Sequence, residues 1–155
     1  MSFQKTPSGT RGARGVGSSN GLTRFVNKMM IKWHKRSGDK MGTNDLLYLT
    51  TVGAKTGQKR QVSLGRFADG DHAWLVVASI GGAAKNPGWY HNIAAHPDQV
   101  WAEFGGNQFR VTPHQLEGEE RAQAWQRITT AQPRYGNYET KTDRVIPIIR
   151  LTRAE

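Results

Sequence analysis

The sequence contains no cysteine among its 155 residues. A disulfide framework, thiolate catalysis and a cysteine-based metal site are therefore excluded. No apolar run approaches the roughly 18 residues that a membrane-spanning helix needs, and no apolar segment with a small-residue cleavage site stands near the N-terminus. We therefore expect a cytoplasmic protein. Peripheral contact with the inner face of the cell membrane is an alternative that the first helix, described below, leaves open.

Acidic residues are also scarce. The chain has 12 Asp and Glu against 22 Lys and Arg, which gives a formal net charge of +10. Such an excess attracts nucleic acid, an anionic membrane, or a small molecule rich in phosphate and carboxylate groups. No His or Asp spacing typical of a metal site stands out, so no metal is expected. The length fits a single domain with a substantial core.

The first part of the chain differs in composition from the rest. Residues 1–20 are rich in Gly, Ser, Thr and Arg, which predicts a disordered basic tail. Residues 21–42 are interpreted as an amphipathic helix with a linker, and residues 43–155 as the folded domain. The helix is predicted over Leu22–Arg36, where apolar residues recur at helical spacing and form one stripe: Leu22, Phe25, Val26, Met29, Met30 and Trp33. We expect this stripe to dock on the domain; a basic amphipathic helix lying on an anionic membrane is the alternative.

From Leu46 the apolar pattern becomes typical of strands. Strands are predicted over Leu46–Val52, Arg60–Phe67, His72–Ser79, Gln99–Phe104, from Asn107 to about Gln115, and over Ile146–Thr152. Asp69-Gly-Asp71 is predicted to be a hairpin turn. Pro147 indicates that the last strand is an edge strand or begins late.

A helix is predicted over Glu119–Thr130, with Ala122, Trp125 and Ile128 on one face, and a loop over Gln132–Thr142. Short strands linked by hairpins, with few helices, favour a small and mostly antiparallel barrel: an α+β fold that is mostly β.

Two segments suggest an anion site. The stretch from Gly81 to Asn92 reads as a glycine loop that follows a buried strand and opens a helix. Its two glycines allow close backbone approach, Lys85 adds a cation, and Pro87 suits a first helical position. Free N–H groups at such a helix start favour anions. The alternative is a hairpin loop followed by a packing helix.

The second segment is the turn Gly53-Ala-Lys-Thr-Gly57, with Arg60 shortly after it. It is not a Walker loop, which needs four residues between its glycines and ends in Gly-Lys-Ser/Thr. A lysine and an arginine close to a short glycine turn can still hold a phosphate, the lysine as a point charge and the arginine as a fork.

The two basic segments belong to a set of three motifs that follow one another along the chain, and this set is specific. They are Leu-Thr-Thr-Val-Gly-Ala-Lys-Thr-Gly-Gln-Lys-Arg60, Ala78-Ser-Ile-Gly-Gly-Ala-Ala-Lys-Asn-Pro-Gly-Trp-Tyr-His-Asn92, and Tyr135…Tyr138…Thr142-Asp-Arg…Ile-Pro147. Together they resemble the deazaflavin-dependent nitroreductase family, which uses coenzyme F420, an 8-hydroxy-5-deazaflavin with an oligoglutamate tail. The resemblance runs from about Leu46 to Leu151.

The resemblance implies a split β-barrel, of the kind found in flavin-binding oxidoreductases, with flanking helices. It also implies that the two basic segments grip the phosphate and tail of the coenzyme, and that the ring lies near Trp89 and Asn92. The coenzyme-binding residues so implied are Thr51, Gly53, Lys55, Thr56, Gly57, Arg60, Ala78, Ser79, Gly81, Gly82, Lys85, Asn86, Pro87, Trp89 and Asn92.

Tyr135 and Tyr138 are the candidate catalytic residues, because the resemblance folds their segment over the ring, where a phenol could stack on a substrate or donate a proton. Each tyrosine could instead be only a packing aromatic. Gly65 and Gln132 stand where the family often has aromatics on the substrate side, and Ala54 and Ile80 stand where basic residues can occur.

The implied activity is hydride transfer from the reduced deazaflavin to a small-molecule electron acceptor: a quinone, a nitroaromatic or an activated enone. A non-catalytic barrel that holds flavin, haem or lipid is one alternative. A basic nucleic-acid-binding barrel is a weaker one, and nucleic acid is not an expected partner, because the aromatics do not interleave with cations along adjacent strands. The oligomeric state stays open.

Overall fold

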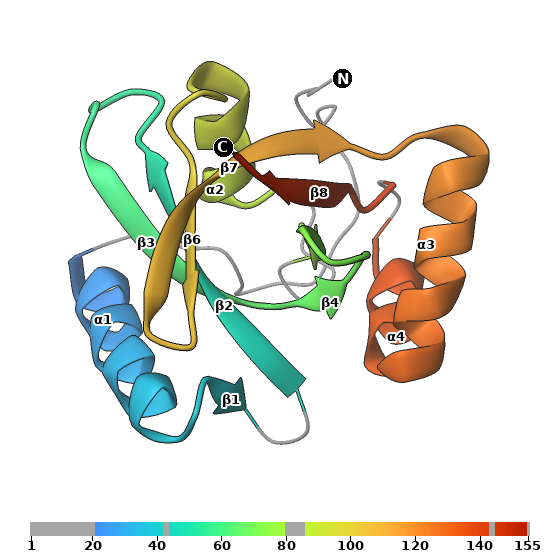
Figure 1. Cartoon of the computed structure of the whole chain (residues 1–155), viewed down its shortest axis with the longest axis horizontal. Coiled ribbons are helices and arrows are strands. Elements are labelled where there is room, and N and C mark those ends of the chain that lie inside the picture. The colour runs from blue at the N-terminus through green and yellow to red at the C-terminus, as the bar shows by residue number, and fades with distance from the viewer. Residues whose placement is uncertain (1–20, 42–43, 80–85, 143–144, 155) are drawn as a thin grey trace.

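The computed structural model describes residues 21–41, 44–79, 86–142 and 145–154; the predicted tail 1–20 lies outside them. Within these residues the chain forms an antiparallel sheet with helices around it (Figure 1). The strands are β1 (Lys40–Met41), β2 (Asn44–Val52), β3 (Lys59–Gly65), β4 (Phe67–Ala68), β5 (Ala73–Val77), β6 (Trp101–Phe104), β7 (Asn107–Gln115) and β8 (Ile148–Arg153). The helices are α1 (Gly21–Arg36), α2 (Gly88–Ala95), α3 (Gly118–Ala131) and α4 (Arg134–Thr140).

The sheet closes on itself through a bend at Arg66. Strand order is β1-β2-β6-β7-β8-β5-β4, with β3 also paired to β2. Only Arg66 separates β3 from β4, so one bent segment pairs with β2 at its first end and with β5 at its second. The Arg66 guanidinium donates to the Leu46 carbonyl and lies 4.3 Å from the Phe104 ring centroid. The result confirms the predicted mostly-β barrel with flanking helices.

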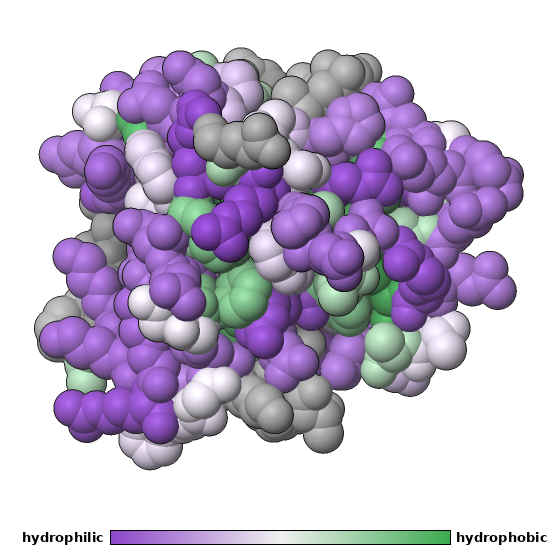
Figure 2. Space-filling model, viewed as in Figure 1, coloured by the Kyte–Doolittle hydropathy of each residue, from purple (hydrophilic) through white to green (hydrophobic). Residues whose placement is uncertain are grey.

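Strand β5 separates two hydrophobic cores, because successive side chains of a strand point to opposite faces. Val76 and Ala78 belong to the core inside the barrel, together with Trp89 of α2. Leu75 and Val77 belong to a second core, which α3 and α4 cover from outside. Figure 2 shows that the face seen in Figure 1 is mostly hydrophilic, with small apolar areas near its centre. Most apolar side chains are therefore enclosed in one core or the other.

Helix α1 is present as predicted, but the part of it whose side chains are described docks through a different face. From Asn27 onward, Ile31 and His34 are its buried residues, 4 % and 7 % exposed, whereas Met29, Met30 and Trp33 of the predicted docking stripe are 57 %, 45 % and 73 % exposed. The side chains of Leu22, Phe25 and Val26 lie outside the described ones. The prediction that Met29, Met30 and Trp33 dock on the domain is wrong. The physical reason is that the surface under α1 offers polar groups that need polar partners. Asn27 donates to the Gln61 carbonyl at 2.8 Å, and Lys35 pairs with Glu103 at 2.5 Å.

The last third of the chain corrects three details. The predicted loop over Gln132–Thr142 contains α4, which Tyr135 anchors in the second core. Strand β8 begins after Pro147, as one alternative expected, but it is no edge strand, since it pairs with both β5 and β7. In α3 the buried residues are Ala124 and Ile128, and Ala122 is exposed.

Candidate active site

The β2–β3 turn is tight and depends on glycine. The Gly53 N–H donates to the Gln58 carbonyl at 2.8 Å, and the Gly57 N–H donates to the Gly53 carbonyl at 2.9 Å. A Cβ at Gly53 would lie 2.5 Å from Thr56 Oγ1, closer than such atoms approach. Gly57 has φ 68°, a left-handed conformation that favours glycine. The turn therefore favours glycine at Gly57 through its backbone conformation, and at Gly53 it leaves little room for a Cβ unless the Thr56 side chain moves.

Cationic side chains gather at this turn. Lys55 is exposed. Arg60 is partly buried and pairs with Thr51 in the β2–β3 register, so the side chains of Arg60 and Thr51 lie on the same face of the sheet. Among the described residues, neither Lys55 nor Arg60 forms an ion pair. Lys59 points to the opposite face, where its Nζ lies 4.6 Å from the Trp101 ring centroid. The turn thus presents two cations that can meet an anion.

Asn92 joins α2 to the same turn. Its Oδ1 accepts a hydrogen bond from the Ala54 N–H at 2.9 Å, and its Nδ2 donates to Thr51 Oγ1 at 3.1 Å. Thr51 is only 1 % exposed, so this second bond is enclosed by protein. The structure therefore brings the end of the predicted Gly81–Asn92 segment directly against the Gly53–Gly57 turn.

The start of α2 is fixed by burial. Trp89 and Tyr90 are 6 % and 2 % exposed, and the Tyr90 hydroxyl donates to Gln115 Oε1 at 2.7 Å. Pro87 is the N-cap, with extended backbone, rather than the first helical residue as predicted. Asn86 precedes it and is partly buried. Three predicted coenzyme contacts lie outside the described residues: Gly81, Gly82 and Lys85.

Ala78 and Ser79 follow β5 and are both buried, at 0 % and 8 % exposure. The Ala78 N–H donates to the Pro147 carbonyl at 2.9 Å. Ala78 packs in the barrel core, and its neighbour Val77 packs in the second core. The end of β5 therefore contacts both cores.

The candidate catalytic tyrosines lie on α4. Tyr135 is 7 % exposed in the second core, and Tyr138 is partly buried beside it. Their ring centroids are 5.4 Å apart, and the Phe67 ring of β4 lies 5.7 Å from that of Tyr135. Trp89 belongs to the other core. The tyrosines and the basic turn are therefore placed by different parts of the fold.

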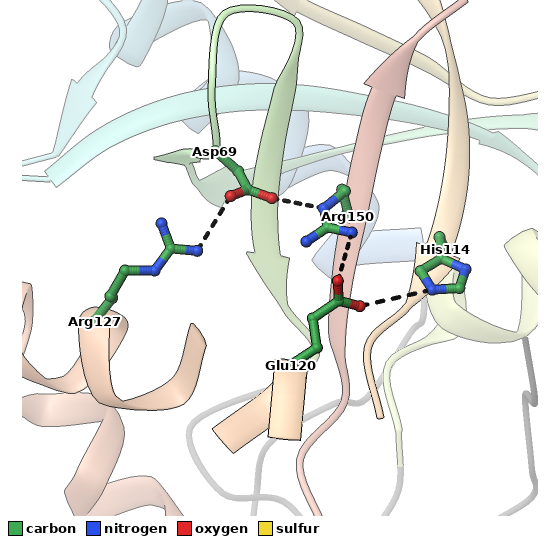
Figure 3. A network of polar contacts seen from close by, with 5 residues as sticks. All are labelled: Asp69, His114, Glu120, Arg127 and Arg150. Atoms are coloured by element: carbon green, nitrogen blue, oxygen red, sulfur yellow. Dashed lines mark hydrogen bonds and ion pairs between the residues drawn. The ribbon is translucent and has the colours of Figure 1, made fainter. Parts of the chain in front are cut away.

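Helix α3 carries an ion-pair network that the sequence patterns did not indicate (Figure 3). Asp69 accepts from Arg150 Nε at 2.6 Å and from Arg127 at 3.2 Å, and Arg150 also reaches Glu120 at 3.2 Å. His114 Nε2 lies 4.0 Å from Glu120. These residues lie far apart in the chain, so no local spacing could have shown that they meet.

The network shifts the pKa of its central residues. Partial burial alone would raise the pKa of Asp69, but hydrogen bonds from Arg150 and Arg127 outweigh it and hold that pKa below its ordinary value. The hydrogen bond to Asp69 raises the pKa of Arg150 in turn. Both shifts favour the charged pair.

Two hollows flank Arg127. One, of about 770 Å³, lies over the network and includes Glu120 and Arg150 in its lining. The other, of about 350 Å³, is lined in part by Phe67 and Gln132. Neither hollow includes the basic turn in its lining.

A family model described as F420H(2)-dependent quinone reductase matches residues 22–153. The chain belongs to this family. A curated F420H(2)-dependent quinone reductase of Mycobacterium tuberculosis is 40% identical over 147 residues, which cover 87% of this chain and 97% of that protein.

Solved structures agree with the family. An F420-H2 dependent reductase, FDR-A, superposes with TM-score 0.61 and 41% identity over 68% of this chain and 92% of its own. HutZ, a haem storage protein of Vibrio cholerae, has TM-score 0.53 at 14% identity, covering 83% of this chain and 91% of its own, so it shares the fold alone. The predicted family and split β-barrel are confirmed.

Proposed function

We propose that this protein reduces quinones with F420H2. Family membership over residues 22–153 is the observation that carries the proposal. It makes the chain a deazaflavin-dependent oxidoreductase, with F420 as the coenzyme, and favours this function over a non-catalytic barrel. The reduced deazaflavin, when bound, supplies the hydride. The protein supplies the binding, the orientation and the electrostatics.

The basic turn fits the anionic part of this coenzyme. Lys55 and Arg60 lie beside a tight glycine turn and have no ion-pair partner among the described residues. A phosphate or an oligoglutamate carboxylate would supply the missing partner, and Arg60 can hold it with two parallel hydrogen bonds. Asn92 and Thr51 support this site indirectly, because their hydrogen bonds fix the turn to α2.

The remaining predicted contacts are proposed for the ring. Ala78, Ser79 and Trp89 lie where β5 and α2 meet the barrel core. Tyr135 and Tyr138 reach the other side of β5 and are proposed to orient the acceptor or supply its proton. Nitroaromatics and activated enones stay predictions as further acceptors.

A quinone as the electron acceptor suggests a location for the protein in the cell. Met29, Met30 and Trp33 form an exposed apolar face on α1, with exposed Lys28 and Lys32 beside it. Such a face can rest on an anionic membrane, where lipophilic quinones reside. We propose peripheral contact of α1 with the inner face of the cell membrane. Among the helices described, none is both long and apolar enough to cross a membrane.

Coenzyme selection tests the function. F420 and FMN are titrated in parallel by fluorescence, and the reduced form of whichever binds is then offered a quinone. The proposal expects F420 to bind more tightly than FMN, because the turn suits a longer anionic tail, and expects quinone-dependent reoxidation of F420H2. Tighter binding of FMN would overturn it.

A further inference from the structure

The ion-pair network of Asp69, Arg127, Arg150 and Glu120 joins three separate elements. Asp69 lies in the turn between β4 and β5, Arg150 on β8, and Arg127 and Glu120 on α3 (Figure 3). Both oxygens of Asp69 are used, Oδ1 by Arg127 and Oδ2 by Arg150. One carboxylate therefore fixes α3 to two parts of the barrel at once.

The network controls the half of α3 that leads into α4. Near its start, α3 has two other polar anchors: Arg121 donates to the Ile146 carbonyl at 2.7 Å, and Glu120 pairs with Arg150. Near its end, Arg127 is the ion-paired residue within the described part of the chain. Only Gln132 and Pro133 separate α3 from α4. Arg127 therefore lies close in the chain to the start of α4.

Strand β4, which leads into this turn, also contacts α4 directly. Phe67 of β4 contacts Tyr135 edge-on at 5.7 Å, and Tyr135 contacts Tyr138 in the same way at 5.4 Å. The α3 and α4 helices are joined by one more bond, from Trp125 Nε1 to Glu139 Oε2 at 2.8 Å. Strand β4 and the turn after it thus contact the helix pair at two points, one aromatic, at Phe67, and one ionic, at Asp69.

We infer that this network is a positioning device that sets where α4 holds Tyr135 and Tyr138 relative to the barrel. It touches neither the proposed coenzyme turn nor the tyrosines themselves, so its effect falls on the acceptor step alone. This inference rests on the proposed function insofar as that step is quinone reduction.

The outer pairs of the network contribute precision of position more than stability. Arg127 and Glu120 are 57 % and 51 % exposed, so the pairs they form contribute little to folding stability, whereas the inner Asp69–Arg150 pair, 17 % and 26 % exposed, contributes more. A displacement of about 1 Å in a positioned group can still cost ~100-fold in rate. The Arg127–Asp69 pair, which is weak as a stabiliser because Arg127 is exposed, can therefore be strong as a positioner.

The test compares Arg127→Gln and Asp69→Asn with Glu103→Gln. The control breaks the Lys35–Glu103 pair, which is also surface-exposed but lies under α1, away from α3. Deuterium uptake of segment 132–142 is measured without ligand, alongside F420 affinity and the kcat and KM for a quinone. Arg127→Lys keeps the positive charge and tests whether a cation at this position is enough to restore wild-type uptake and kinetics.

Both network variants are expected to raise uptake in 132–142 and to lower kcat/KM for the quinone by roughly ten- to a hundredfold. F420 affinity should not change, and the control should behave as wild type. The double variant, Arg127→Gln with Asp69→Asn, should be no worse than the more impaired of the two single variants. Wild-type uptake and kinetics in both variants, or an equal loss in the control, would overturn the inference. Absence of turnover in the wild type would overturn the proposed function instead, and the uptake comparison would still decide the positioning role.

Discussion

Asn92→Ala removes the contact that ties α2 to the basic turn. The native amide makes two bonds, one from the Ala54 N–H at 2.9 Å and one to Thr51 Oγ1 at 3.1 Å. Alanine makes neither. Since Thr51 is 1 % exposed, water cannot easily replace the lost donor at its hydroxyl.

The cost follows from these contacts. Each net hydrogen bond contributes about 1 kcal/mol, and a buried polar group left without its partner costs about 1–3 kcal/mol, so the variant should lose roughly 2–4 kcal/mol. For a domain of this size a loss of about 3 kcal/mol lowers Tm by roughly 6–12 °C. F420 affinity should fall as well, because the turn that carries Lys55 is no longer held.

Asn92→Asp separates the two effects. A carboxylate can still accept from the Ala54 N–H, and it can accept from the Thr51 hydroxyl if that group turns to donate. Stability should therefore stay closer to that of the wild type. Coenzyme affinity should nevertheless drop, because a negative charge now stands beside the cations of the turn.

The assay is thermal unfolding together with fluorescence titration of F420. Asn107→Ala is the matched control, since it removes one exposed turn bond, from Nδ2 to the Gly105 carbonyl at 3.3 Å. Its effect should be within about 0.5 kcal/mol. The reasoning is refuted if Asn92→Ala is as mild as this control, or if Asn92→Asp binds F420 as well as wild type.

Four further outcomes are expected. Lys55→Ala should weaken F420 binding by roughly one to two decades, as a charge-assisted contact of about 1.5–3 kcal/mol is lost; a lower Tm with unchanged affinity would mean that it is structural. Tyr138→Phe should lower kcat for quinone and leave F420 affinity unchanged; wild-type turnover would exclude a role for the hydroxyl. Trp33→Ser should reduce flotation with anionic vesicles; equal flotation would exclude α1. Asp69 has a folded pKa below its ordinary 3.8, so its contribution to stability is present above that value and is lost as pH falls through the folded pKa. Asp69→Asn should flatten this acid limb of the unfolding free energy; an unchanged limb would contradict the shift.

Strand periodicity and turn residues carried most of the fold prediction. Runs such as Leu46–Val52 are apolar because β2 is buried on both faces, inside the barrel and under α1. The hairpin at Gly70 was predictable because its φ of 82° needs a residue without a Cβ. Local chemistry of this kind is visible in any single sequence.

The predictions were wrong where tertiary contacts, rather than the local sequence, determine the structure. Helix α4 contains Gly136 and Asn137, both poor helix formers, and packing of Tyr135 stabilises it. The docked face of α1 depends on polar groups of the barrel such as Glu103, which no helical spacing reveals.

For the site, the sequence indicated the two basic segments, and in the described part of the chain Asn92 joins them. The ring contacts and the tyrosine roles remain predictions. The network around Asp69 could not be predicted, because its members come from β7, β8, α3 and a turn.

The central claim is quinone reduction by F420H2. The most direct measurement mixes the protein anaerobically with F420H2, adds a quinone, and follows the visible absorbance of the oxidised deazaflavin. The account predicts that this absorbance returns only when both protein and quinone are present, and more slowly with Lys55→Ala at limiting coenzyme. Absence of protein-dependent reoxidation, or equally fast quinone-dependent oxidation of NADPH supplied in place of F420H2, would contradict it.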